Sequence, residues 1–238
     1  MFGFLVNTFD IVLYKPLFNA LVLIYNYLPW RDLGLAIIIL TLAIRFILYP
    51  LSVKALNSQK TLQNLQPKLQ EIQKKYKNDK EKQAKETFEL YRKEKINPFS
   101  GFFLALVQLP ILIALYRVFW LGFKPEELVN LYSFVFNPSH INTIFLGTAD
   151  LAKPNMIFAI LAGIFQFFQT KMLTPKTAKK QGNEPDFSKI MQNQMLYFFP
   201  VLTIIILLSL PSAIGLYWIV SGVFSIVQQY FALKKTTA

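Results

Sequence analysis

The chain has 238 residues, of which 54% are hydrophobic and 16% aromatic, and its formal net charge is +12. Apolar runs of about 20 residues in such a composition are typical of helices that cross a bilayer, not of an ordinary soluble domain. No cysteine is present, which excludes disulfides, thiolate metal sites and a lipid-modified cysteine.

The N-terminal segment, residues 1–32, is apolar but contains Asp10 and Lys15-Pro16. Because proline cannot donate a backbone hydrogen bond, these residues predict that a single helix stops near Tyr14. Two interpretations follow for this segment. The favoured one is an amphipathic helix lying in the membrane interface, and the competing one is an additional membrane span.

Five further apolar runs have about the length that a bilayer requires. They cover residues 33–53, 98–120, 154–173, 194–210 and 213–233. The last two are separated only by the turn around Pro211-Ser212, which predicts a tight antiparallel helical hairpin. The sequence therefore predicts an all-α membrane protein with five transmembrane helices.

Lysine and arginine residues in the connecting segments indicate the orientation. Residues 54–95 carry twelve of them, residues 171–190 five and the tail two, against four in the segments before the first span and between the second and third. The positive-inside rule then places the basic connections and the tail in the cytoplasm. The predicted cytoplasmic segments are 54–97, 174–193 and 234–238, and the outer ones are 1–32 and 121–153. This distribution accounts for the net charge without DNA as a partner.

The first cytoplasmic segment, 54–97, has the pattern of a helical hairpin. Apolar residues spaced by three and four predict one stripe along its first helix. The stripe consists of Leu62, Leu65, Leu69, Ile72 and Tyr76. Asn78-Asp79 predicts the turn, and the following residues again favour a helix. The stripe is consistent either with a hairpin that packs on itself or with an arm that captures a partner.

Arg45 is the most unusual residue of the apolar runs. An arginine at the centre of a membrane helix costs about 2.5–3.5 kcal/mol on insertion scales. No aspartate or glutamate in the five runs could neutralise it. Arg45 is therefore expected to face either backbone carbonyls or water held within the membrane. Arg117 differs, since it is expected near the outer end of its span, where it could reach the headgroups.

Polar side chains in the other runs favour the second possibility. Each one alone is consistent with a hydrogen bond between helices. Together with an unpaired arginine, they predict a polar cavity shared by several spans. The candidate groove residues from this pattern are Arg45, Thr41, Gln108, Gln166, Gln169 and Ser221, with Trp218 beside the polar residues of the last span.

Bond-making catalysis is not expected from these residues. His140 is the only histidine, and the spans contain neither a histidine nor an acid that could activate a nucleophile. No spacing of metal ligands and no glycine-rich phosphate loop is found. We therefore expect neither an enzyme nor a metal or other cofactor.

Six segments in order resemble the YidC/Oxa1/Alb3 membrane protein insertases. They are TLAIR (41–45) with YPL (49–51), LQPKLQEIQKKY (65–76), LYRKEKINP (90–98), QLPI (108–111) with ALY (114–116), YFFP (197–200) and GLYW (215–218). The chain departs from the pattern at Ser221-Gly222, where many members have two asparagines. It also lacks the large extracytoplasmic domain of Gram-negative members, so it resembles the short bacterial form.

The resemblance implies a hydrophilic groove that is open to the cytoplasm and to lipid, with Arg45 at its centre. By motif, Thr41 and Tyr116 would contact the client. It further implies a multi-pass protein of the bacterial plasma membrane that inserts and helps fold newly made membrane proteins without ATP. The Sec translocon, the signal recognition particle pathway and the ribosome stay open as further partners. A small anion channel or carrier, and a scaffold subunit in which Arg45 is structural, remain the alternatives.

Overall fold

The structure is a computed structural model that describes residues 2–94, 100–122, 124–174 and 194–234. The chain divides into two units, which are described separately. Unit 1 consists of residues 1–47 and 109–229, and unit 2 of residues 48–108 and 230–238. Helices α6 (Ser100–Leu121) and α10 (Ser212–Lys234) belong partly to each. The predicted connection 174–193 lies almost wholly outside the described residues, as does the tail beyond Lys234.

Unit 1 begins with an unbroken helical segment, so the prediction that a helix stops near Tyr14 is wrong. Helix α1 (Phe2–Phe9) continues through a π-helical turn, η1 (Asp10–Tyr14), into α2 (Lys15–Tyr27). Lys15 N donates to Asp10 O, five residues earlier, and Pro16, which has no amide to donate, lies in the first turn of α2. By length and composition, residues Val6–Tyr27 could cross a membrane.

The predicted span 33–53 is not one continuous helix. Helix α3 (Leu33–Ile47) ends before Leu48, and α4 (Tyr49–Lys75) starts directly after it. Pro50 explains the break, because its ring would clash with the carbonyl of Phe46 and it cannot donate to that carbonyl. Proline is tolerated in the first turn of α4, where amides have no helical partner.

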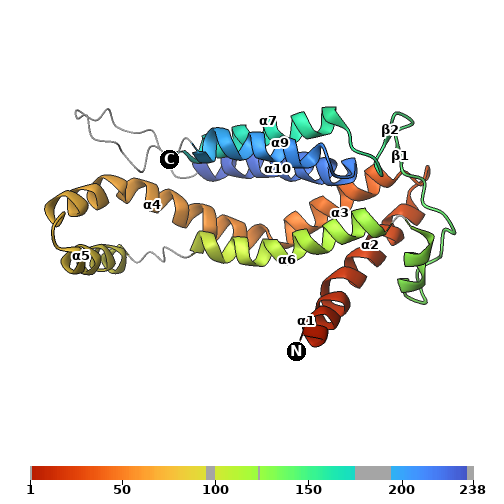
Figure 1. The fold of residues 1–238 in the computed structure, drawn as a ribbon, viewed down its shortest axis with the longest axis horizontal. Coiled ribbons are helices and arrows are strands. Elements are labelled where there is room, and N and C mark those ends of the chain that lie inside the picture. The colour runs from red at the N-terminus through yellow and green to blue at the C-terminus, as the bar shows by residue number, and fades with distance from the viewer. Residues whose placement is uncertain (1, 95–99, 123, 175–193, 235–238) are drawn as a thin grey trace. The chain divides into compact units, whose positions relative to one another are not determined.

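Three helices of unit 1, α10 and two that precede it, lie close together (Figure 1), and glycines allow their close approach. These are α7 (Met156–Leu173) and α9 (Phe199–Leu207), the latter preceded by a second π turn, η3 (Gln194–Phe198). A Cβ on Gly163 would clash with Ile204 of α9. On α10, Cβ atoms at two glycines seven residues apart would lie 3.1 Å from phenylalanines of α7 that are also seven apart. The pairs are Gly215 with Phe158 and Gly222 with Phe165. Because both numbers rise together, α7 and α10 run parallel, as the third and fifth spans should.

The segment between α6 and α7 contains the described strands, which the sequence did not predict. After a 3₁₀ turn, η2 (Pro125–Asn130), strands β1 (Ile144–Phe145) and β2 (Ala149–Asp150) form an antiparallel pair. Phe145 packs on Gly34, where any Cβ would overlap its ring. The segment also satisfies the free amides at the start of α10, since Ser212 N donates to Lys153 O at 2.9 Å and Ala213 N to Leu151 O at 3.1 Å. It thus caps the helices of unit 1 at one end.

Unit 2 contains a pair of helices at the position of the expected hairpin. Helix α4 packs against α5 (Lys80–Lys93), which Asp79 caps by accepting a hydrogen bond from Lys82 N at 3.0 Å. Lys68 on α4 bonds Glu94, at the end of α5, at 2.8 Å. The hydrogen bond and charge of Lys68 lower the pKa of that carboxyl group. The last residues of the predicted hairpin segment, 95–97, lie outside the described residues.

The predicted number of five spans is not established. Within the described ranges, three helices are long and apolar enough to cross a membrane: Val6–Tyr27, Met156–Leu173 and Ser212–Ala232. The pair α3 and α4 gives a fourth if it counts as one broken span. Two apolar helical stretches, Leu106–Leu121 and Gln194–Leu207, are shorter. The all-helical membrane architecture is as predicted.

Candidate functional site

Arg45 lies near the end of α3, beside α10. The rings of Phe46 and Phe224 meet edge to face with centroids 5.3 Å apart, which joins the two helices. Tyr217 of α10 interacts electrostatically with the Arg45 guanidinium. The Nε atom of Arg45 is buried and has no hydrogen-bond partner among the described residues. Among the described residues, Arg45 thus has Tyr217 as a neighbour and forms no ion pair with a carboxylate.

Further buried polar atoms without a described partner lie on the helices that pack here. They are Gln166 Oε1 on α7 and Ser221 Oγ and Gln229 Oε1 on α10. Gln166 and Ser221 directly adjoin the close contact between Phe165 and Gly222. A buried polar group that lacks a partner costs about 1–3 kcal/mol. Such groups in native proteins indicate a site for water or for a ligand.

The other predicted groove residues of unit 1 differ in accessibility. Thr41 is fully buried and donates to Ile37 O at 2.6 Å, so its hydroxyl is satisfied within α3. Gln169 and Trp218 are half-buried, and the indole ring meets Tyr217 edge to face at 6.2 Å. Tyr116 on α6 is 37% exposed and stacks on Trp120 at 5.7 Å.

The structure thus brings some predicted groove residues together and not others. Helix α10 contacts both α3 and α7, and these three helices carry six of the predicted residues: Arg45, Thr41, Gln166, Gln169, Trp218 and Ser221. Within the described part of the chain, Tyr116 stacks on Trp120 and is not seen in contact with these residues. Gln108 belongs to unit 2, where it is half-buried.

The predicted apolar stripe of the hairpin is only partly covered. Leu65 is 4% exposed, whereas the other four residues are half-buried. Phe88 on α5 remains 64% exposed and lines a hollow between α4 and α5 together with Gln73 and Thr87. The pairing of the two helices therefore leaves apolar surface on this hairpin.

The sequence suggested that Arg117 could reach the lipid headgroups. In the structure its side chain is paired within the protein. Its Nη1 forms an ion pair with Asp10 of η1, and its guanidinium lies 4.6 Å from the centroid of the Tyr14 ring. Sequence reasoning treated Asp10 only as an interruption of an apolar run. A lone acid in such a run could have signalled a paired cation elsewhere.

Further hydrogen bonds tie the N-terminal helix to the segment after α6. The Tyr14 hydroxyl donates to Glu127 Oε2 at 2.6 Å. Asn19 donates to Asn130 O at 3.1 Å and accepts from Tyr132 N at 2.7 Å. We call the residues Asp10, Tyr14, Asn19, Arg117, Glu127 and Asn130 the outer seam.

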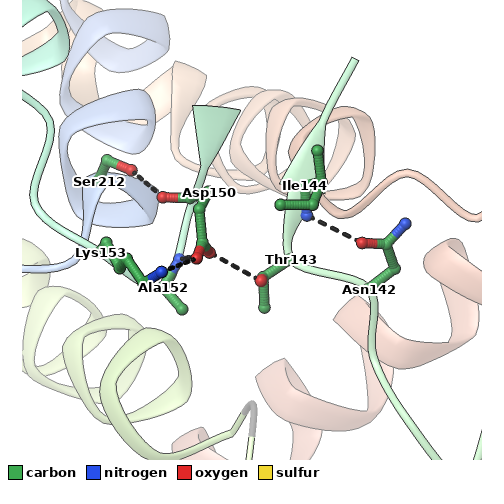
Figure 2. A network of polar contacts seen from close by, with 7 residues as sticks. All are labelled: Asn142, Thr143, Ile144, Asp150, Ala152, Lys153 and Ser212. Atoms are coloured by element: carbon green, nitrogen blue, oxygen red, sulfur yellow. Dashed lines mark hydrogen bonds and ion pairs between the residues drawn. The ribbon is translucent and has the colours of Figure 1, made fainter. Parts of the chain in front are cut away.

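Asp32 and Asp150 hold the strand pair of the same segment. Asp32, which is 7% exposed, caps α3 by accepting from Leu35 N at 2.9 Å and also accepts from Leu146 N at 2.7 Å. Leu146 has a φ of 47°, a strained value for a residue with a side chain, and Asp32 fixes its amide. Figure 2 shows that Asp150 accepts from Thr143 Oγ1 at 2.8 Å and pairs with Lys153 at 3.3 Å.

The described residues contain no group of three or more histidines, cysteines or acids that could hold a metal ion. The chemistry available at Arg45 is therefore that of a buried cation, hydroxyls and amides, which suits binding of a carboxylate or an anion.

Comparison with known proteins identifies the family. The model of the 60Kd inner membrane protein family matches residues 23–238. The chain belongs to the YidC/Oxa1/Alb3 family. Among curated relatives, the membrane protein insertase YidC of Fusobacterium nucleatum is 35% identical over 204 residues, covering 86% of this chain and 87% of the relative. That of Oceanobacillus iheyensis is 36% identical, covering 86% and 76%.

Longer family members share the same region. The membrane protein insertase YidC of Geobacter metallireducens is 33% identical over 95% of this chain but only 38% of its own length. The family places the chain among multi-pass proteins of the bacterial inner membrane. The residues that pair with Arg117 and Glu127, namely Asp10 and Tyr14, precede the range that the family model matches.

Proposed function

We propose that this chain is a membrane protein insertase that takes up polar segments of its clients at Arg45. The observation that carries the proposal is the buried Arg45 Nε, which has no partner among the described residues. Its helix α3 meets α10 through Phe46 and Phe224, and α10 also carries the unpaired Ser221 Oγ. The names of its relatives support the same activity. Clients are newly made membrane proteins, and the reaction needs no ATP.

The proposed groove lowers the cost of moving a polar client segment through hydrocarbon. Each unsatisfied polar group in the bilayer core costs several kcal/mol, so an entry route lined by hydroxyls, amides and water reduces the barrier. Arg45 attracts an acidic segment, while the apolar part of the client partitions into lipid. The membrane potential and this partitioning drive the remainder.

We also propose that α1–α2 lies along the outer membrane interface and does not cross the bilayer. Helix α2 packs on α3, and the ion pair and side-chain hydrogen bonds that Asp10, Tyr14, Asn19 and Asn26 make to other elements go to the last turn of α6 or to the segment that follows it. These contacts cover about 24 Å of helix at one membrane level, given a rise of 1.5 Å per residue. The N-terminus is then outside and the C-terminus cytoplasmic, as the charge distribution predicts.

In this orientation the hairpin of α4 and α5 stands in the cytoplasm. Its partly covered stripe, from Leu62 to Tyr76, would hold a client, and the signal recognition particle pathway, the ribosome or the Sec translocon would deliver one. These partners rest on the family resemblance and on the exposed apolar surface of the hairpin.

Depletion of the protein in cells tests the proposal. Small one- and two-span proteins with acidic outer segments should then fail to insert. A map of client crosslinks from positions 41, 45, 108 and 218 would locate the contact surface.

The competing function is a small carrier or channel that recognises an anion through Arg45. The unpaired Nε atom is compatible with it, although no internal repeat, a common feature of carriers, is apparent in the sequence. Normal insertion after depletion, together with lost anion flux, would establish this alternative and exclude the insertase.

A further inference from the structure

Arg117 of unit 1 supports an inference about client specificity. Arg117 lies four residues before the end of α6, and its side chain is 33% exposed. An arginine at this level would bind any acidic client segment that reaches the outer side. In the structure its guanidinium is instead engaged by Asp10 and lies over the rings of Tyr14 and Phe9.

We propose that Asp10 masks Arg117, so that an acidic client segment is not held at the outer end of α6 and stays available to Arg45. This inference rests on the proposed insertase function. It assigns Asp10, Tyr14 and the N-terminal helix a part in client handling. The ligand class that the mask excludes is an acidic peptide.

The neighbours of the pair leave Arg117 without a second carboxylate. Glu127, which also contacts Tyr14, forms no ion pair with Arg117 among the described residues; its Oε2 accepts from Tyr14 Oη at 2.6 Å and from Asn130 Nδ2 at 3.0 Å. We therefore expect that, when Asp10 loses its charge, Arg117 is left without an ion-pair partner and can bind an acidic peptide. The aromatic rings would still hold the guanidinium in place by cation–π contact.

The direct test measures binding of a fluorescent acidic peptide to the purified full chain in nanodiscs. Asp10→Asn should raise the affinity about threefold, the size of an exposed ion pair. The double variant Asp10→Asn/Arg117→Gln should return to the wild-type affinity. A swapped pair, Asp10→Arg/Arg117→Asp, keeps a mask and should also bind no more tightly than wild type.

A second readout follows insertion into proteoliposomes of two clients that differ only in an acidic or neutral outer segment. Asp10→Asn should slow the acidic client and leave the neutral one unchanged. Equal slowing of both clients, or unchanged peptide affinity in Asp10→Asn, would make the pair purely structural and overturn the inference. If the wild type inserts neither client, the proposed function fails, while the peptide measurement still decides the mask.

Discussion

The outer seam and the helices around Arg45 differ in whether their polar side chains have hydrogen-bond or ion-pair partners. In the seam, nearly every charged or amide side chain has a protein partner, from Asp10–Arg117 to Tyr14–Glu127. Asn26, which is not part of the seam, donates from Nδ2 to Phe136 O, but its Oδ1 has no partner among the described residues. Around Arg45, by contrast, buried polar atoms on α3, α7 and α10 lack partners. Paired groups hold a structure together, whereas unpaired buried groups remain available to water or to a ligand.

The largest expected effect is at Arg45. Arg45→Ala should abolish insertion of clients with acidic outer segments, because the cation that attracts them is gone, while the protein still accumulates. Arg45→Lys should retain part of the activity, since a water-filled groove requires positive charge more than a bidentate donor. Insertion assays in depleted cells, with immunoblots for protein level, measure both. Normal insertion by Arg45→Ala would refute the groove mechanism and leave the arginine a structural role.

The largest expected loss of stability is at Asp32. Asp32→Ala leaves the amides of Leu35 and Leu146 without their partly buried acceptor and should lower the free energy of unfolding by about 2–4 kcal/mol. Thermal unfolding in detergent measures this change. Asp79→Ala, which removes an exposed helix cap on α5, is the matched control and should cost less than about 1 kcal/mol. Equal losses in both variants would show that burial at the outer end adds nothing.

Removal of the unpaired polar groups near Arg45 should have the opposite effect on stability. Ser221→Ala and Gln166→Leu remove buried polar atoms that have no described partner, so the unfolding temperature should stay constant or rise. Insertion of acidic clients should slow about twofold to fivefold, the effect of losing one hydrogen bond of about 0.5–1 kcal/mol. Thr41→Val is the comparison, since its hydroxyl is satisfied by Ile37. A clear loss of stability in Ser221→Ala would mean that its hydroxyl serves packing.

The sequence predicted the apolar helices well and singled out Arg45, because both inferences depend on local information. Apolar run length and a single charge within a run are readable without knowing what lies beside them. Pro50 could have indicated the break at Leu48, since its effect on the preceding turn is also local.

The outer seam was not predictable in the same way. Asp10 and Arg117 are 107 residues apart in the chain, and Tyr14 and Glu127 are 113 apart. Which acid pairs with which arginine depends on how the helices pack, and the local sequence around each residue does not contain that information. The strand pair was missed because each strand has only two residues, too few for an alternating pattern.

The smallest expected effect concerns Asp150, whose carboxylate is paired but lies near the surface. Burial alone would raise its pKa, but hydrogen bonds from Thr143 and Ala152 and the charge of Lys153 outweigh it and lower the pKa below the usual 3.8. A lowered pKa stabilises the folded state above the unfolded pKa, and this contribution disappears as the pH falls through the folded pKa. Asp150→Asn should therefore destabilise by less than about 1 kcal/mol at pH 7.

The difference in unfolding temperature between wild type and Asp150→Asn should shrink as the pH falls from 7 to about 3. Thr143→Val removes one of the hydrogen bonds that stabilise the carboxylate, so it should show a smaller difference of the same sign. A difference that stays constant with pH would mean that Asp150 acts only as a hydrogen-bond acceptor. In that case hydrogen bonds alone would hold the outer end together. The main role of its ion pairs would then be to keep cations such as Arg117 from binding the client.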